Sequence, residues 1–235
     1  MSQESRGGDM ESSSLVDTSK PFVFLDYGGL IMDYQFNSET LLRAHKMALA
    51  HINSKNGDQV TLKDLSRAHD LEMKLYVNER NRTQREDNLN DMIGEILEHL
   101  KVKRASAFEV AQIYELNDHD AIPMPTTMES IPELRNRAKL GIISNLPHNS
   151  IYHELEKYGL EGVFRPIILS HEVGYRKPHK IIYQEAINRV GLMGRPHQAI
   201  FFSHDQEEVD GALAVGMQSH LVKNLGEVLT KLQTS

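Results

Sequence analysis

The chain has 235 residues, of which 40% are hydrophobic and 25% are charged, a composition typical of a soluble globular protein. A net charge of −7 argues against a nucleic-acid partner, because binding phosphates requires a basic face. The lack of cysteine excludes disulfides, a thiolate nucleophile and a cysteine metal site. No apolar run is long enough for a membrane span or a signal peptide, so we expect a soluble, cytoplasmic protein with no membrane partner.

The first predicted strand ends at an aspartate. Residues 1–20 are rich in Ser, Gly, Glu and Asp, and we expect them to form a disordered tail. Phe22–Leu25 is an uninterrupted apolar run, which predicts a strand buried on both faces of a parallel sheet. Asp26 follows it, at the position where open α/β sheets bind ligands, and Gly28 and Gly29 allow a ligand to approach the backbone closely. The alternative is that Asp26 only caps a turn.

Residues 37–118 have the pattern of a separate helical domain. Apolar residues recur at helical spacing in four segments, which begin near Ser38, Thr61, Asn88 and Ser106. Ser38 is the predicted cap of the first helix, and Thr61 with Asp64 resembles a capping box. Because few strand-like runs interrupt these segments, we expect a helical cap domain inserted after the first strand.

The rest of the chain alternates between helices and strands. Prolines between residues 118 and 132 predict an extended connection, followed by a helix over 131–138 with Pro132 in its first turn. The later predicted strands are 140–143, 166–169, 199–202 and 219–222, and the later helices are 150–158, 179–190, 207–215 and 227–232. This alternation predicts an α/β core, a Rossmann-like doubly wound parallel sheet over residues 21–36 and 119–235.

Polar residues follow four of the predicted strands. They are Asp26, then Ser144 and Asn145, then His171, Glu172 and Lys177, and finally Ser203, His204, Asp205 and Glu208. Because the carboxyl ends of parallel strands meet at one edge of the sheet, we expect these groups to face a common crevice that binds a small-molecule substrate.

Four segments in this order, FVFLDYGGLI, IISN, GYRKP and FFSHDQEEVDGALAVGM, resemble the motifs of the haloacid dehalogenase (HAD) superfamily of hydrolases. The predicted helical domain stands where that superfamily carries its first type of cap. The resemblance implies that Asp26 is a nucleophile that attacks phosphorus, or carbon in the dehalogenase branch. It also implies that Ser144, expected just before a helix, donates a hydrogen bond to the phosphoryl group and that Lys177 neutralises the charge. Pro178 and Tyr183 fit the helix start that follows the family lysine.

The resemblance further implies a Mg²⁺ ion held by Asp26, the Gly28 carbonyl, Asp205 and Glu208. Two residues depart from the phosphatase pattern. Gly28 replaces the second aspartate, the family's general acid/base, so the leaving-group proton would come from water, Asp33 or a cap residue. His204 replaces a metal ligand, and since Mg²⁺ prefers oxygen ligands we interpret it as a helix-cap or hydrogen-bonded histidine.

The candidates for substrate contact are Gly28, Gly29, Asn145 and Arg85. Arg85 is one of four candidate arginines, with Arg43, Arg80 and Arg82, although a charged run such as 78–87 is usually a solvated helix face. The favoured function is a Mg²⁺-dependent phosphatase of a small phosphorylated metabolite. The alternatives are a metal-independent 2-haloacid dehalogenase-type hydrolase and a catalytically weakened binding protein. We expect a monomer or a homodimer formed through the cap.

Overall fold

The computed structural model describes residues 20–56 and 60–234. The tail predicted over residues 1–20 lies outside this range except for Lys20. Across the described residues, every helix is too short or too polar to cross a membrane.

A five-stranded sheet forms the centre of the core, in the order β5-β4-β1-β6-β7. Its strands are β1 (Phe22–Leu25), β4 (Lys139–Ser144), β5 (Ile167–Leu169), β6 (Ala199–Ser203) and β7 (Gln218–Leu221). All four pairings are parallel, and β1 lies between β4 and β6. The predicted parallel sheet is therefore confirmed, and Asp26 follows its central strand.

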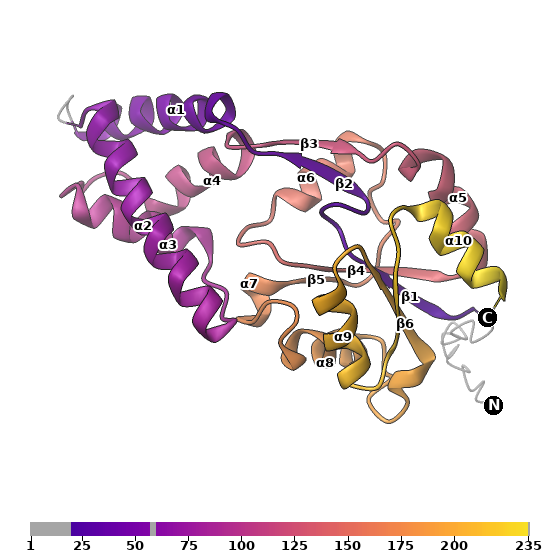
Figure 1. Ribbon diagram of the computed structural model, residues 1–235. Helices are drawn as coiled ribbons and strands as arrows, with labels where there is room; N and C mark the ends of the chain where they lie inside the picture. The colour runs from indigo at the N-terminus through magenta and orange to yellow at the C-terminus, as the bar shows by residue number, and fades with distance from the viewer. Residues whose placement is uncertain (1–19, 57–59, 235) are drawn as a thin grey trace, which may run out of the picture.

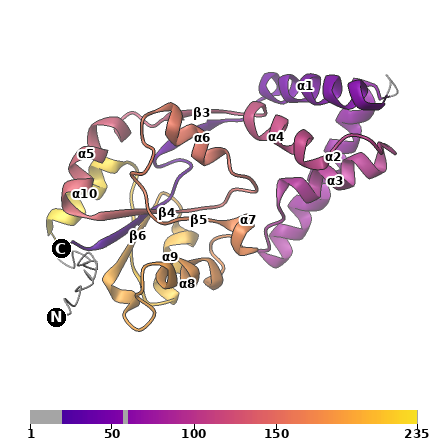
Figure 2. The ribbon, with the colours of Figure 1, turned by 180° about the vertical axis from the view of Figure 1, so that it is seen from behind.

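Helices cover both faces of this sheet, as Figures 1 and 2 show from opposite sides. One face packs against α5 (Thr127–Arg137), α6 (Ser150–Lys157) and α10 (Leu225–Thr234), and the other against α8 (Lys180–Arg189) and α9 (Gln206–Ala214). Side chains of a strand alternate between faces, so Val23 and Leu25 join the first layer while Phe24 joins the second. The strand is thus buried on both sides, which explains its unbroken apolar sequence.

Four further helices pack together beyond the carboxyl ends of the strands (Figure 1). They are α1 (Ser38–Asn56), α2 (Leu62–Thr83), α3 (Leu89–His99) and α4 (Ala107–Asn117), and they enclose a hydrophobic cluster of their own. The capping box of Thr61 and Asp64 is present at the start of α2. At α1, the Asn37 side chain rather than that of Ser38 accepts the backbone N–H bonds of Glu39 and Thr40. Ser38 is already the first helical residue.

The connections between the two parts contain structure that the sequence did not predict. β2 (Met32–Gln35) and β3 (Asp120–Pro123) pair as an antiparallel ribbon, because the chain leaves and re-enters the core side by side. α5 begins at Thr127, whose hydroxyl donates to the Ile31 carbonyl at 2.8 Å, so Pro132 lies inside the helix rather than in its first turn. Two short elements, α7 (Ser170–Val173) and the 3₁₀ helix η1 (Pro196–Gln198), were not predicted either.

The buried carboxylate of Glu154 binds side chains from the connections between the sheet core and the four helices, a region called the junction below. Glu154 accepts hydrogen bonds at 2.8 Å from the hydroxyls of Tyr27 and Tyr34 and one at 2.9 Å from Nε2 of His119. The other ring nitrogen of His119 lies 2.6 Å from Asp118. With a carboxylate at each nitrogen, the ring satisfies both contacts only as an imidazolium. Burial alone would lower the pKa of His119, but its bonds to Asp118 and Glu154 raise it to about 9.

Because His119 is charged at this junction, we expect the free energy of unfolding to fall as the pH rises. The pKa of His119 is about 9 when folded and 6.5 in a model peptide. Its contribution is therefore complete below about pH 6.5 and is lost as the pH rises toward 9. The contribution is on the order of 3 kcal/mol at most. His119→Gln should flatten the dependence of the free energy of unfolding on pH in this interval, measured by urea denaturation. His153→Gln, on the exposed side of α6, should keep the wild-type slope, and an unchanged slope in His119→Gln would contradict the assignment.

Candidate active site

Asp26 lies at the point where the central strand turns away from the sheet. Its backbone N–H donates to the Phe202 carbonyl at 2.9 Å, which extends the pairing with β6 by one residue. The chain then turns tightly, and Gly29 adopts a φ of 77°, a left-handed conformation that favours glycine. Asp26 thereby stays fixed to the sheet while the loop after it opens a space above its carboxylate.

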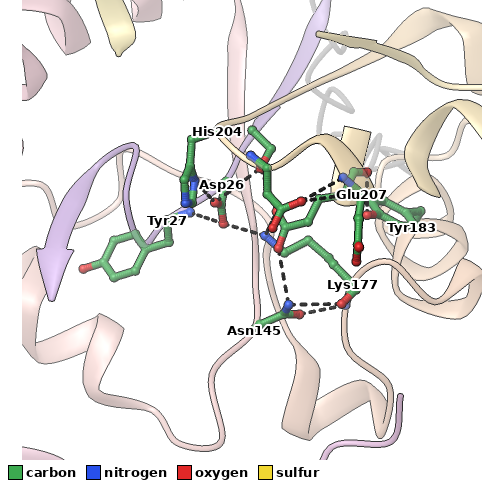
Figure 3. Close-up of polar contacts among 10 residues, drawn as sticks. Asp26, Tyr27, Asn145, Lys177, Tyr183, His204 and Glu207 are labelled. Atoms are coloured by element: carbon green, nitrogen blue, oxygen red, sulfur yellow. Dashed lines mark hydrogen bonds and ion pairs between the residues drawn. The ribbon is translucent and has the colours of Figure 1, made fainter. Parts of the chain in front are cut away.

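Lys177 crosses from a distant part of the chain to this carboxylate (Figure 3). Its ammonium nitrogen is 2.5 Å from Oδ1 of Asp26 and 2.8 Å from Oε2 of Glu208. All three side chains are buried or nearly so. The Ser203 hydroxyl donates to the same Glu208 oxygen at 2.7 Å. The structure therefore brings Asp26 and Lys177 together at one edge of the sheet.

Asn145 positions the lysine. Its amide oxygen accepts the backbone N–H of Lys177 at 2.7 Å, and its amide nitrogen donates to the Lys177 carbonyl at 3.2 Å (Figure 3). Asn145 was a predicted substrate contact. Its amide makes these bonds to Lys177, and the residue also lines the cavity described below. Tyr183 secures the opposite side, because its hydroxyl donates to the Glu208 carbonyl at 2.7 Å.

The charges in this cluster keep Asp26 ionised. Burial alone would raise the pKa of Asp26, but the Lys177 ammonium and the His204 ring hold it below its ordinary value. Burial would likewise lower the pKa of Lys177, but Asp26 and Glu208 raise it. Burial raises the pKa of Glu208, and the negative charge of Asp26 adds to that effect. Asp26 is therefore a carboxylate at neutral pH, which is the form that acts as a nucleophile.

His204 contacts the second oxygen of Asp26. Its Nδ1 is 2.9 Å from Asp26 Oδ2, and its ring lies against the turn at Gly29, where a Cβ atom would be 2.7 Å from the ring. The hydrogen bond to Asp26 raises the pKa of His204. The sequence indicated a hydrogen-bonded or capping histidine without naming its partner. The partner follows from the sheet order, since β1 and β6 are neighbours and their ends are adjacent.

The carboxylates expected to bind Mg²⁺ have other partners. Asp205 caps α9, with Oδ1 accepting the backbone N–H of Glu207 at 2.8 Å. Glu208 accepts from Lys177 and Ser203 through Oε2 and from the Asn145 amide through Oε1 at 3.3 Å. Within residues 20–56 and 60–234, no group of three or more His, Asp or Glu side chains is placed to hold a metal ion. The predicted ligand set of Asp26, Gly28, Asp205 and Glu208 therefore does not fit Mg²⁺ in this arrangement.

A cavity of about 720 Å³ extends from Asp26 into the helical region. Asp26, Gly28, Ser144, Asn145, His204, Asp205 and Glu208 line its core end. Phe36, Leu41, His69, Met73, Tyr76, Arg80, Leu89, Met92 and Tyr114 line its helical end. Its volume lies within the range of small-molecule sites, roughly 300–1,000 Å³. Ser144 faces this cavity as predicted, but the next helix begins only at Ser150, so no helix N-terminus directly follows it.

Several predicted contacts lie elsewhere. Arg85 is not among the residues that line the cavity and lies over the Tyr175 ring instead, with its guanidinium carbon 5.8 Å from the ring centre. Arg80, another of the four candidate arginines, lines the cavity in its place, together with Arg176. His171 is also not among the residues that line the cavity, and its Nδ1 lies 2.9 Å from the Leu146 carbonyl oxygen.

Comparison with known proteins identifies the family. The family model described as haloacid dehalogenase-like hydrolase matches residues 37–222. The chain therefore belongs to the haloacid dehalogenase-like hydrolases, as the sequence motifs indicated. The match begins after Asp26, so it does not include the candidate nucleophile.

Two curated relatives are phosphatases. A glyceraldehyde 3-phosphate phosphatase from Methanothermobacter thermautotrophicus is 30% identical over 104 residues, which are 43% of this chain and 45% of the relative. The pyrimidine 5'-nucleotidase YjjG from Escherichia coli is 28% identical over 95 residues, 40% of this chain and 42% of the relative. The chain thus matches less than half the length of either protein.

Solved structures share the fold over nearly the whole chain. A 2-haloacid dehalogenase from Pseudomonas syringae has a TM-score of 0.63 at 16% identity, covering 92% of this chain and 98% of that one. A HAD phosphatase from Thermococcus onnurineus has a TM-score of 0.56 at 20% identity, covering 90% of this chain and 97% of that one. At these identities the likeness shows the fold alone.

The buried cluster makes a prediction for stability. Lys177→Met should lower the free energy of unfolding by about 3–5 kcal/mol, because it leaves two buried carboxylates without their cation. Lys180→Met, on the exposed start of α8, should change it by no more than about 0.5 kcal/mol. In the double variant with Asp26→Asn, the loss should be smaller than the sum of the single losses, since one carboxylate no longer needs the cation. Additive losses in guanidinium denaturation would show that the two side chains do not interact.

Proposed function

We propose that this protein is a phosphomonoester hydrolase that acts on a small phosphorylated metabolite with Asp26 as its nucleophile. The observation that carries the proposal is the ionised Asp26 carboxylate, paired with Lys177 at 2.5 Å, at the floor of a ligand-sized cavity. Lys177 serves two purposes here. It keeps Asp26 deprotonated, and it offers positive charge to an anion that approaches Asp26. Similarity to two phosphatases supports phosphorus over carbon as the electrophile.

The proposed reaction has two displacements at phosphorus. An Asp26 carboxylate oxygen forms a bond to phosphorus, and the bond from phosphorus to the ester oxygen breaks. The departing oxygen takes a proton and leaves as an alcohol. Water then attacks the aspartyl phosphate at phosphorus, the bond to Asp26 breaks, and inorganic phosphate leaves with the carboxylate restored. Ser144 and the backbone N–H groups beyond it are the proposed donors to the phosphoryl oxygens.

The proton for the leaving group cannot come from residue 28, where the phosphatase pattern has an aspartate as general acid/base. Gly28 has no side chain to supply it, and Asp33 is exposed on β2 and is not among the residues that line the cavity. Asp118 does line the cavity, at the junction with the helical region. Because the Asp118 carboxylate is already paired with the His119 imidazolium at 2.6 Å, water is the proposed donor.

The residues that line the cavity indicate what the organic part of the substrate is like. Apolar and aromatic side chains, among them Phe36, Met92 and Tyr114, line its helical end. The Tyr114 hydroxyl and the Nδ1 atom of His69 are buried there with no hydrogen-bond partner in the described part of the chain. Such groups favour a ligand that supplies the missing bonds, because a buried polar group without a partner is costly. We therefore propose an ester whose organic part is flat or partly apolar and carries a polar group at its far end.

A second candidate reaction uses the same nucleophile on carbon. In a 2-haloacid, Asp26 would form an ester bond to the carbon and release halide, and water would then hydrolyse the ester. The observation that favours it is the absence, within the described residues, of a carboxylate cluster suited to Mg²⁺. Release of chloride from 2-chloropropionate distinguishes this reaction from phosphate release.

Phosphate release from a panel of sugar phosphates, nucleotides and an aryl phosphate tests the main proposal. At least one ester should be hydrolysed, and Asp26→Asn should lower kcat/KM by on the order of 10³-fold or more, because an amide is a poor nucleophile. Asp33→Asn makes the same substitution on the exposed strand β2 and should leave the rate unchanged. Circular dichroism should show that both variants fold. Failure to hydrolyse any ester, or full activity in Asp26→Asn, would refute the proposal.

A further inference from the structure

The side chain of His204 fills the space beside the nucleophile. Its Nδ1 lies 2.9 Å from Asp26 Oδ2, while Oδ1 of Asp26 already accepts from Lys177 and from the Tyr27 backbone N–H at 2.8 Å. Both carboxylate oxygens therefore have donors from the protein. Figure 3 shows the His204 ring and the Lys177 ammonium on different sides of the Asp26 carboxylate.

Gly29 leaves room for the His204 ring because it has no side chain. A Cβ atom at residue 29 would lie 2.7 Å from two atoms of the His204 ring, a distance that real contacts of this kind do not reach. Gly29 is therefore required for close approach as well as for its φ of 77°. The His204 side chain is 47% exposed, whereas that of Asp26 is only 6% exposed, so the ring covers part of the carboxylate while it remains in contact with solvent.

The other candidate ligands already have partners in the protein. Asp205 Oδ1 accepts a hydrogen bond that caps α9. Glu208 accepts from Lys177 and Ser203 through Oε2 and from Asn145 through Oε1. A cation beside Asp26 would compete with these donors, and Mg²⁺ requires near-octahedral oxygen ligands and gives up its water reluctantly.

We propose that the His204 side chain occupies the position that a divalent cation would need beside Asp26, so that this active site works without Mg²⁺. The catalytic part of this inference rests on the proposed phosphatase function, whereas exclusion of the metal does not. His204 then takes over one task of a metal, since its N–H holds Asp26 Oδ2 in place while Lys177 holds Oδ1. His204 is on this view a positioning residue for the nucleophile.

Titration calorimetry with MgCl₂ tests exclusion of the metal without any substrate. The wild-type protein should show no saturable binding. His204→Asp puts an oxygen ligand in place of the ring and should show saturable Mg²⁺ binding, because Mg²⁺ prefers oxygen ligands. His197→Asp adds the same carboxylate at an exposed position in η1 and should behave like the wild type. If circular dichroism shows that His204→Asp does not fold, His204→Asn, which also offers an oxygen, is assessed by the same criterion.

Activity provides the second measurement. Hydrolysis by the wild type should be unchanged by EDTA and by added Mg²⁺, whereas residual hydrolysis by His204→Asp should rise with Mg²⁺. Saturable Mg²⁺ binding by the wild type, loss of its activity in EDTA, or failure of the folded oxygen-bearing variant to bind Mg²⁺ would each overturn the inference. A wild type that hydrolyses phosphate esters only with Mg²⁺ would refute the inference and leave the proposed function standing. If the Mg²⁺ titrations give the expected results but no ester is hydrolysed, the proposed function is refuted and the exclusion of the metal stands.

Discussion

The site depends on one ammonium group shared between two buried carboxylates. Lys177 is 2.5 Å from Asp26 and 2.8 Å from Glu208, and these three side chains come from three segments that are far apart in the sequence. Two carboxylates this close together compete for the charged form, and the pKa of Glu208 is raised by burial and by the charge of Asp26. The lysine counteracts both effects and holds the pKa of Asp26 below its ordinary value. The sheet order and the bracing of the Lys177 backbone by Asn145 both serve to place this charge.

The spacing of apolar residues in the sequence predicted much of the fold. The apolar run Phe22–Leu25, the helical repeats after Ser38 and the later alternation of strands and helices each correspond to observed elements. The ribbon of β2 and β3 was missed, because the pairing of two short segments about 85 residues apart depends on where the inserted helices begin and end. α5 was placed too late, since Pro132 was taken to mark a first turn.

The candidate site was predicted in part. The strand ends carried Asp26, Ser144 and Asp205 to one edge, because a parallel sheet has only one carboxyl edge. The contact between His204 and Asp26 needed the order of the strands, which periodicity does not reveal. The sequence likewise could not show which arginine faces the cavity, because an exposed helix carries its arginines on several faces. Those choices depend on how the helical region packs against the core.

In the proposed reaction, Asp26 forms a covalent bond to the phosphorus of the substrate. Mass spectrometry of protein quenched in acid during turnover of a phosphate ester tests this directly. One phosphoryl group should be found on the peptide that contains Asp26, and none on that peptide in Asp26→Asn. A phosphoryl group on another residue, or steady product formation with no labelled peptide, would show that Asp26 is not the nucleophile.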